Sequence, residues 1–186
     1  KNIPWKNIDF FFGDERCVAK NDVLSNYFMV TSIFENKLSK KNIYEINGDA
    51  FDPNIEAERY DSILPVKFDL VFLSVGTDGH VASIFPNSSS FNSRRKVTYI
   101  SDSPKPPCKR ITVTPNVICG AERVIVMIEG KIKAEIAAKA LLNPIDKVSL
   151  PMRLTIGRSW FLDEEASGLL RKKKISNFFE TSVVYA

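Results

Sequence analysis

The chain has 186 residues, of which 44% are hydrophobic and 26% are charged. This composition excludes a disordered chain and indicates one ordinary domain or at most a small pair. The 26 basic and 22 acidic residues give a net charge of +4, which slightly favours small anionic ligands and does not by itself indicate nucleic acid. No apolar stretch is long enough to span a bilayer, so no membrane association is expected.

Histidine and cysteine usage narrows the chemistry further. His80 is the single histidine, which excludes every metal site that needs two histidines. The three cysteines, Cys17, Cys108 and Cys119, are far apart and form no C-x-x-C pair. Their spacing argues against a zinc ribbon or a disulfide scaffold and favours a reducing compartment. We therefore expect a cytoplasmic protein that uses no metal.

Apolar runs rich in β-branched and aromatic residues predict the strands. The predicted strands are residues 8–12, 43–46, 68–75, 97–100, 111–114, 124–128 and 154–156. Two of these runs, 70–75 and 124–128, are apolar on both faces. That pattern is typical of central strands in a parallel sheet with helices on both sides, so both strands are predicted at the centre of such a sheet.

Helical spacing of apolar residues between these runs predicts the helices. The predicted helices are residues 22–38, 54–64, 115–120, 131–142 and a last helix that Asp163 caps and that ends at Leu170. Strands that alternate with helices indicate an α/β domain, here residues 1–170. Residues 171–186 begin with the basic run 171–174 and are predicted as a C-terminal tail, for which a solvated helix end is favoured over a nucleic-acid patch.

The most informative segment follows the strand at 68–75. Gly76, Asp78, Gly79 and His80 form a glycine-bearing turn at the carboxyl end of that strand, which is where open α/β sheets place ligands. Asp78 and His80 are two residues apart, so both can face one crevice, and a histidine suits a general base near neutral pH. The alternative is a loop histidine that is hydrogen-bonded only for structure.

Two further segments carry charge at strand ends. Asp14 and Glu15 precede Arg16 after the strand at 8–12, and such a group can bind a polyol and a phosphate. Lys105 lies between prolines, with Arg110 at the next strand, and a lysine held rigidly loses little entropy when it binds an anion. The alternatives are a surface ion-pair cluster for the first segment and a rigid turn with solvated cations for the second.

Taken together, the segments supply one candidate base, two acidic orienting groups and several cations. They contain no G-x-S-x-G motif and no metal-binding cluster. The residues therefore indicate proton-transfer or water chemistry on a small anionic substrate, and the cations favour a phosphorylated one.

These segments resemble the sequence motifs of 6-phosphogluconolactonases. The matching residues are GDERCV at 13–18 with SNY at 25–27, FDLVFLSVGTDGHVASIFP at 68–86, SPKPP at 103–107 with RIT at 110–112, and Gly130, Lys133, Trp160 and Asp163. They occur in the family's order from about Trp5 to Leu170. The resemblance implies a Rossmann-like α/β fold with a largely parallel sheet, shared with glucosamine-6-phosphate deaminases and ribose-5-phosphate isomerases.

The resemblance also implies an activity: hydrolysis of 6-phospho-D-glucono-1,5-lactone in the oxidative pentose phosphate pathway, without metal or cofactor. His80 would be the base that activates water, and Asp78 and Asp14 would orient the base and the sugar hydroxyls. The residues implied in substrate binding are Arg16, Lys105 and Arg110 at the phosphate and Gly76 and Gly79 in the turn. Fusion or association with glucose-6-phosphate dehydrogenase is a further expectation.

The sequence departs from the family pattern at its start. Family members carry a first strand and an S-G-G-S-T-P-like turn before the region that matches Trp5, so residues 1–170 are expected to be a domain without these elements. A glucosamine-6-phosphate deaminase-like isomerase is one alternative, which is disfavoured because residues 81–86 contain no glutamate. A catalytically inactive sugar-phosphate-binding fragment is the other.

Overall fold

The structure is a computed structural model that describes residues 3–34, 37–143, 145–172, 177–178 and 181–185. Its α-helices are α1 (Asn26–Phe34), α2 (Pro53–Ile63), α3 (Pro115–Gly120), α4 (Ala134–Leu142) and α5 (Glu164–Lys172). Its strands are β1 (Phe10–Phe11), β2 (Asp14–Arg16), β3 (Ile43–Tyr44), β4 (Leu70–Ser74), β5 (Val97–Ile100), β6 (Arg110–Val113), β7 (Arg123–Ile128), β8 (Ser159–Leu162), β9 (Asn177–Phe178) and β10 (Thr181–Tyr185). Short 3-10 helices include η3 (Ser89–Asn92), η4 (Lys131–Lys133) and η5 (Pro151–Thr155).

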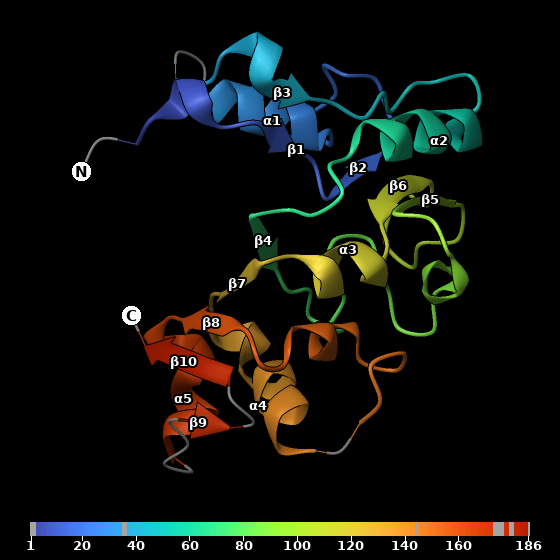
Figure 1. Cartoon of the computed structure of the whole chain (residues 1–186). Coiled ribbons are helices and arrows are strands. Elements are labelled where there is room, and N and C mark those ends of the chain that lie inside the picture. The colour runs from blue at the N-terminus through green and yellow to red at the C-terminus, as the bar shows by residue number, and fades with distance from the viewer. Residues whose placement is uncertain (1–2, 35–36, 144, 173–176, 179–180, 186) are drawn as a thin grey trace.

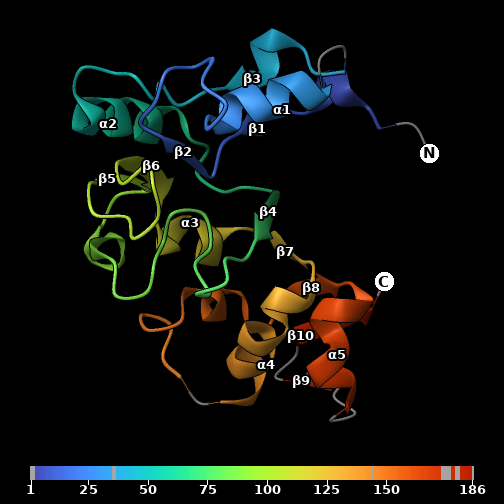
Figure 2. The ribbon, with the colours of Figure 1, turned by 180° about the vertical axis from the view of Figure 1, so that it is seen from behind.

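The strands form three sheets. The largest has the order β4-β7-β8-β10-β9, and its first four strands run parallel. The short strands β1 and β3 also pair in parallel, whereas β2, β6 and β5 form an antiparallel sheet. Figures 1 and 2 show α1, α2 and β3 at one end of the molecule, and α4 and α5 at the other. The predicted α/β fold with a largely parallel sheet flanked by helices is confirmed.

One face of the five-stranded sheet is packed against helices. Alternate residues of β7 and β8, such as Val126 and Trp160, are fully buried in a core that also includes Ala137 of α4 and Leu170 of α5. The Trp160 indole donates a 2.9 Å hydrogen bond to Thr155 Oγ1, so its N–H is satisfied inside the core. The predicted central position of residues 124–128 is confirmed, because β7 lies between β4 and β8.

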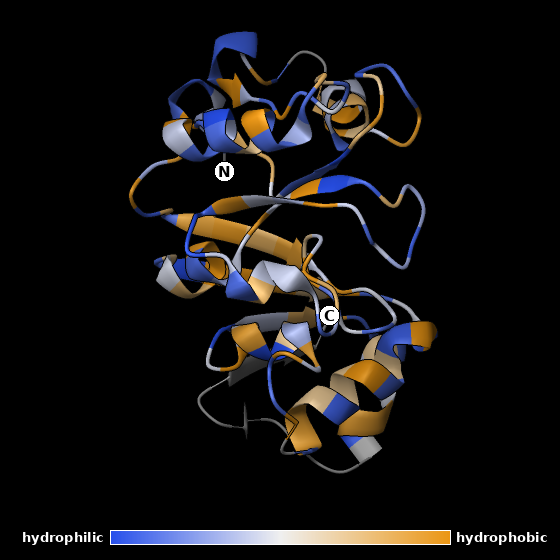
Figure 3. Ribbon diagram, turned by 90° about the vertical axis from the view of Figure 1, so that its right-hand side faces the viewer, coloured by the Kyte–Doolittle hydropathy of each residue, from blue (hydrophilic) through white to orange (hydrophobic). Residues whose placement is uncertain are grey.

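The opposite face of the same strands is open. Leu70 and Phe72 of β4, Met127 of β7 and Phe161 of β8 are between 37% and 62% exposed. Figure 3 shows hydrophobic strands in the middle of the molecule with helices of mixed colour above and below them. The prediction that both runs are central strands covered on both sides is therefore wrong in two respects for the described residues. Strand β4 lies at the edge of the five-stranded sheet, and both β4 and β7 have one open face. An apolar run records the composition of a strand, and the neighbours that cover it are set by the rest of the fold.

A second core holds the N-terminal half together. Tyr60 of α2 is fully buried, accepts a 2.7 Å hydrogen bond from the Phe12 amide and donates to the Phe12 carbonyl at 3.1 Å. Burial raises the pKa of Tyr60, so the phenol stays neutral. Ile111 and Val113 of β6 pack in the same cluster. This core fixes the chain just before Gly13 and thereby places Asp14 at the start of β2.

Several predicted boundaries change in the structure. The predicted strand at residues 154–156 is wrong: Leu154 and Thr155 end the 3-10 helix η5, Ile156 follows it, and the next strand is β8. So short an apolar run cannot distinguish strand from helix by periodicity. Helix α1 begins at Asn26 instead of residue 22. The tail predicted from residue 171 contains β10, which pairs in parallel with β8, so the sheet extends into that stretch. Half of the basic run, residues 173–174, lies outside the described residues.

Candidate active site

The turn after β4 has a backbone shape that depends on its glycines. The Gly76 amide donates to the His80 carbonyl at 2.9 Å, and the Gly79 amide donates to the Gly76 carbonyl at 2.9 Å. A side chain at Gly76 would overlap the His80 ring, and Gly79 has φ = +83°, a conformation that favours glycine. Both amides are used inside the turn, so direct binding of substrate by Gly76 and Gly79 stays a prediction. Their evident contribution is to bring His80 back over Gly76.

His80 and Asp78 form a close pair on this turn. His80 Nδ1 lies 2.6 Å from Asp78 Oδ1, with the two side chains 18% and 30% exposed. Burial raises the pKa of Asp78, but the hydrogen bond from His80 and the charges of His80 and Lys105 outweigh it and hold this pKa well below its usual range. An ionised Asp78 accepts the Nδ1 proton, which leaves His80 Nε2 with a lone pair that can take a proton.

Lys105 reaches this pair from a different loop. Its Nζ lies 3.3 Å from Asp78 Oδ1 and 3.5 Å from Thr77 Oγ1, and its side chain is 40% exposed. The Ser103 hydroxyl donates to the Lys105 carbonyl at 2.8 Å and accepts from the Lys105 amide at 3.2 Å. We name Asp78, His80 and Lys105 the His80 cluster. It places a candidate base and a positive charge on one partly exposed surface.

Asp14, Ser83 and Arg110 form a second group, the Arg110 cluster. Asp14 Oδ2 accepts a 2.6 Å hydrogen bond from Ser83 Oγ and lies 3.9 Å from Arg110 Nη1. Asn26 of α1 donates to the Asp14 carbonyl at 2.8 Å and to Asp14 Oδ1 at 3.2 Å. The Phe85 ring links the two clusters, because its centre lies 4.5 Å from that of the His80 ring and 5.6 Å from the Arg110 guanidinium carbon.

The acidic pair of the sequence motif is divided between two tasks. Glu15 is almost completely buried, and its carboxylate accepts hydrogen bonds from the Asn26 and Tyr27 amides and from Ser25 Oγ. A carboxylate at a helix N-terminus satisfies free N–H groups and interacts favourably with the helix dipole. Glu15 thus fixes the start of α1, whereas Asp14 faces Ser83. The sequence reading treated both carboxylates as one group and did not assign Glu15 to the helix.

Arg16 lies apart from the His80 cluster. In the register of the antiparallel strands β2 and β6, Arg16 lies opposite Arg110. The Arg16 Nη1 donates to the Leu24 carbonyl at 2.5 Å. Its Nε is buried and has no hydrogen-bond partner within the part of the chain that the structure describes. No contact joins Arg16 to His80, Asp78 or Lys105 in that part of the chain, so its predicted role at a phosphate stays a prediction.

Lys133 adds a cation that the sequence reading noted in a motif but did not assign. Its Nζ lies 3.3 Å from Ser74 Oγ, at the carboxyl end of β4. The preceding Gly130 amide donates to Asp163 Oδ2 at 2.8 Å, which ties the start of η4 to the start of α5. The G-x-x-K spacing was the available signal, but only the pairing of β4 with β7 brings Lys133 to the same sheet edge as the His80 turn.

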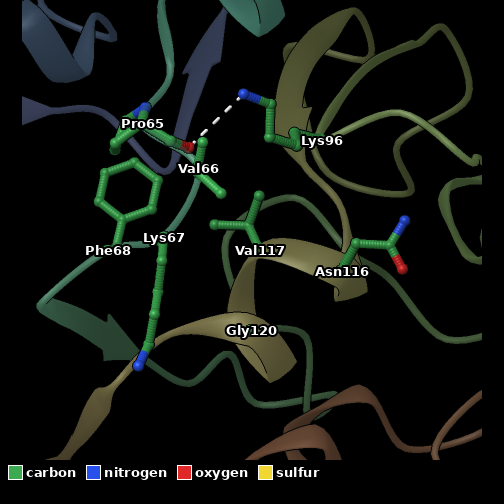
Figure 4. Close-up of a pocket in the computed structure, with 8 residues that line it drawn as sticks. All are labelled: Pro65, Val66, Lys67, Phe68, Lys96, Asn116, Val117 and Gly120. Carbon is green, nitrogen blue, oxygen red and sulfur yellow. Dashed lines mark hydrogen bonds between the residues drawn. The ribbon is translucent and has the colours of Figure 1, made fainter.

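Two hollows in the described part of the chain lie away from His80. The smaller, of about 40 Å³, lies between Pro65, Phe68, Lys96 and Val117 (Figure 4). The larger is an open groove of about 500 Å³ between α2, η3 and β5. Neither is lined by a residue of the His80 or Arg110 cluster. The candidate site is therefore identified by its chemical groups instead of by a cavity.

The fold and the His80 cluster define an α/β protein with a histidine–aspartate pair and a lysine beyond the carboxyl end of a parallel strand. Such a group can move a proton on a small anionic ligand. In the described residues, no group of three or more His, Cys, Asp or Glu side chains could hold a metal ion. No helix in the described part of the chain is long and apolar enough to cross a membrane.

Comparisons with known proteins identify the family. The model of glucosamine-6-phosphate isomerases/6-phosphogluconolactonase matches residues 1–160. A "Probable 6-phosphogluconolactonase 2" of Oryza sativa is 36% identical, over 91% of this chain and 70% of its own length. The crystal structure of 6-phosphogluconolactonase from Thermotoga maritima superposes with a TM-score of 0.77 at 27% identity, covering 87% of this chain and 75% of that one. For the Trypanosoma brucei enzyme the TM-score is 0.73 at 28% identity, covering 89% and 75%. The chain belongs to the glucosamine-6-phosphate isomerase/6-phosphogluconolactonase family.

Proposed function

We propose that the chain is a 6-phosphogluconolactonase, which hydrolyses 6-phospho-D-glucono-1,5-lactone to 6-phospho-D-gluconate. The observation that carries the proposal is the His80 cluster, in which Asp78 Oδ1 lies 2.6 Å from His80 Nδ1 and 3.3 Å from Lys105 Nζ. Relatives named 6-phosphogluconolactonase in a plant and a bacterium, 36% and 30% identical to this chain, support the same activity.

His80 acts as the general base in the proposed reaction. Nε2 takes a proton from water as the water oxygen forms a bond to the lactone carbonyl carbon, and the carbonyl electron pair moves onto its oxygen. When the carbonyl re-forms, the bond from that carbon to the ring oxygen breaks, and the ring oxygen takes the proton from His80. Asp78 holds the ring by Nδ1 and stabilises the imidazolium that forms between the two steps.

A single base suits this substrate. A lactone is an ester that water can open without a covalent enzyme intermediate, so orientation of the reactants and proton transfer can supply the acceleration. General-base catalysis by a positioned side chain contributes about 10²–10⁴-fold. That range sets the expected loss when His80 is removed.

Lys105 is the proposed phosphate ligand of the His80 cluster. Its ammonium group is partly exposed and is held beside Asp78, where it can exchange its contact with Thr77 for a phosphate oxygen. Lys133 supplies a second cation at the same sheet edge. Arg16 remains a predicted ligand with no contact to this cluster among the described residues. A cytoplasmic location and an association with glucose-6-phosphate dehydrogenase also stay predictions.

The isomerase alternative lacks a residue that it needs. Deaminase-like relatives carry a glutamate after the histidine turn, and residues 81–86 contain none. Ring opening and proton transfer between adjacent carbons would need a second acid–base group at this place. We therefore expect hydrolysis of the lactone without isomerisation of glucosamine 6-phosphate.

The test is a lactonase assay on the full chain, corrected for spontaneous hydrolysis, with the His80→Ala variant beside it. We expect activity above the spontaneous rate and a loss of about 10²–10⁴-fold in kcat for His80→Ala. Lys67→Ala is a matched control, because Lys67 forms an exposed ion pair with Glu122 far from the turn. No activity in the unmodified chain would leave the binding-fragment alternative, and a fully active His80→Ala variant would remove His80 as the base.

A further inference from the structure

Arg110 has few donors left for a ligand. Its side chain is 6% exposed, although arginine is rarely buried without a partner. Nε donates to the Pro107 carbonyl at 3.0 Å, and Nη2 donates to the Lys105 and Pro106 carbonyls at 3.1 and 3.2 Å. The remaining nitrogen, Nη1, faces Ser83 Oγ at 3.5 Å and Asp14 at 3.9 Å. All three guanidinium nitrogens are thus directed at the protein itself.

The loop that receives these hydrogen bonds is short of backbone donors. Pro104, Pro106 and Pro107 have no backbone N–H, so the loop forms no regular backbone pattern. Lys105 and Pro107 are half-buried and Pro106 is exposed, so the hydrogen bonds from Arg110 orient the loop by replacing water at its carbonyls. Arg110 gathers three consecutive carbonyls with one planar group, which is a geometry that the point charge of a lysine cannot reproduce.

The Asp14 carboxylate offsets the buried charge. Asp14 lies 3.9 Å from Arg110 Nη1 and is itself held by Ser83 and Asn26. A buried cation needs such a partner, because desolvation of an isolated charge is strongly unfavourable. The contacts of the Arg110 cluster are therefore all made within the protein, and they connect Asp14 through Arg110 to the carbonyl of Lys105.

We propose that Arg110 is a positioning residue that fixes the loop at residues 103–107 so that Lys105 Nζ lies beside Asp78, and that it does not contact the substrate phosphate. The Ser103 hydroxyl holds the same lysine through its amide and carbonyl. This replaces the role at the phosphate that the family resemblance implied for Arg110. The kinetic part of the proposal rests on the proposed lactonase activity, whereas its structural part does not.

A double-mutant cycle separates the two roles. Arg110→Lys keeps the charge and removes the fork of donors, and Lys105→Ala removes the ligand that the fork positions. If Arg110 acts through Lys105, the double variant loses no more kcat/KM than Lys105→Ala alone, within about twofold, because the two residues act as one unit. Losses that multiply in the double variant would make Arg110 an independent ligand and overturn the proposal.

A second variant protects the test against misfolding, because a change at the buried Arg110 can unfold the chain. Ser103→Ala releases Lys105 without disturbing a buried charge, and its loss of kcat/KM should also disappear in the Lys105→Ala background. Lys109→Ala is the matched control, since Lys109 is an exposed neighbouring cation that makes no side-chain contact with the loop among the described residues. We expect its kcat/KM within about twofold of the unmodified chain in either background.

Hydrogen exchange tests the structural part without any activity. The Ser103 amide donates to the Cys108 carbonyl at 3.0 Å, across the loop that Arg110 holds. In Arg110→Lys, exchange at the Ser103 and Lys105 amides should become at least about tenfold faster, whereas amides of β7 should keep their rates. Unchanged exchange at residues 103 and 105 in a folded variant would overturn the positioning role. An inactive unmodified chain with faster loop exchange in the variant would contradict only the proposed function.

Discussion

The two clusters are built around carboxylates in different surroundings. Asp78 faces a histidine and a partly exposed lysine and is itself partly exposed, whereas Asp14 faces a serine, an asparagine and a buried arginine. The Ser83 and Asn26 side chains donate hydrogen bonds to Asp14, and the Arg110 guanidinium donates mainly to backbone carbonyls. The His80 cluster keeps one ring nitrogen and one ammonium group available. We propose on this basis that the His80 cluster, which is open, carries the chemistry, and that the Arg110 cluster, which is closed, holds its surroundings in place.

Among the carboxylates of the two clusters, Asp78 should have the largest effect on the rate when its charge is removed. Asp78→Asn keeps the shape of the side chain but can no longer stabilise the imidazolium or fix the tautomer that leaves Nε2 free. We expect kcat to fall by about 10²-fold or more, with a small change in melting temperature. Lactonase kinetics measure the change in kcat, and thermal unfolding of the same preparation measures the change in melting temperature. A large loss of stability with a normal kcat would mean that Asp78, like Asp14, has a structural role and no part in the reaction.

The same variant carries a pH signature. The pKa of Asp78 in the folded protein is held below its usual range, mainly by His80 and Lys105 acting against burial. A lowered pKa adds stability that is present above the unfolded value of about 3.9 and is lost as the pH falls through the folded value. The difference in melting temperature between the unmodified chain and Asp78→Asn should therefore narrow below about pH 4. A difference that stays constant from pH 7 to pH 3 would contradict this assignment.

Asp14→Asn should reverse the pattern of Asp78→Asn. The substitution leaves the buried Arg110 without its compensating charge, and breaking a buried pair is strongly destabilising. Because Ser83 and Asn26 can still hold the amide, we expect a loss of about 2–3 kcal/mol in the free energy of unfolding. Denaturant unfolding measures it, with kcat of the folded fraction expected to change less than in Asp78→Asn. A drop in kcat equal to that of Asp78→Asn at unchanged stability would assign Asp14 a direct part in the reaction.

The two clusters also differ in how far the sequence predicts them. Gly76, Asp78 and His80 belong to one short segment, so their proximity follows from a single turn, and Gly76 is needed because of the His80 ring itself. Asp14, Ser83 and Arg110 are distant in sequence. They meet because β2 pairs antiparallel with β6 and because the Ser83 amide donates to Thr112 Oγ1 of β6 at 3.1 Å. Residues 14–16 show charge and no apolar alternation, so β2 was not predicted as a strand, and the closed cluster could not be assembled from the sequence.

The burial of individual side chains is the property that the sequence predicts least well. Arg110 and Glu15 are charged residues whose ordinary place is the surface. Both are buried, and the charged group of each is hydrogen-bonded inside the protein. Phe72 and Met127 are apolar, yet both are exposed on the open face of the sheet. In each case the partner residue or covering element comes from a distant part of the chain, which composition and periodicity do not specify.

Glu15→Gln gives the smallest effect and extends the comparison to α1. The amide keeps the volume of the side chain but has one oxygen, so it cannot accept hydrogen bonds from Ser25, Asn26 and Tyr27 on two oxygens as the carboxylate does. We expect a loss of about 1–2 kcal/mol of stability and faster exchange at the first amides of α1. Glu45→Gln is the control, because Glu45 forms an ion pair with Lys20 in which both side chains are exposed.

The measurement also tests how tightly α1 is coupled to the site. Asn26, the first residue of α1, donates to Asp14. A loosened helix start should therefore affect the Arg110 cluster more than the His80 cluster. The expected signature of Glu15→Gln is faster exchange at Asn26 and Tyr27, with KM and kcat within about threefold of the unmodified chain. A large fall in kcat with little change in exchange would mean that Glu15 acts on the reaction by a route other than the helix. In that case the His80 cluster and the Arg110 cluster would not have separate roles.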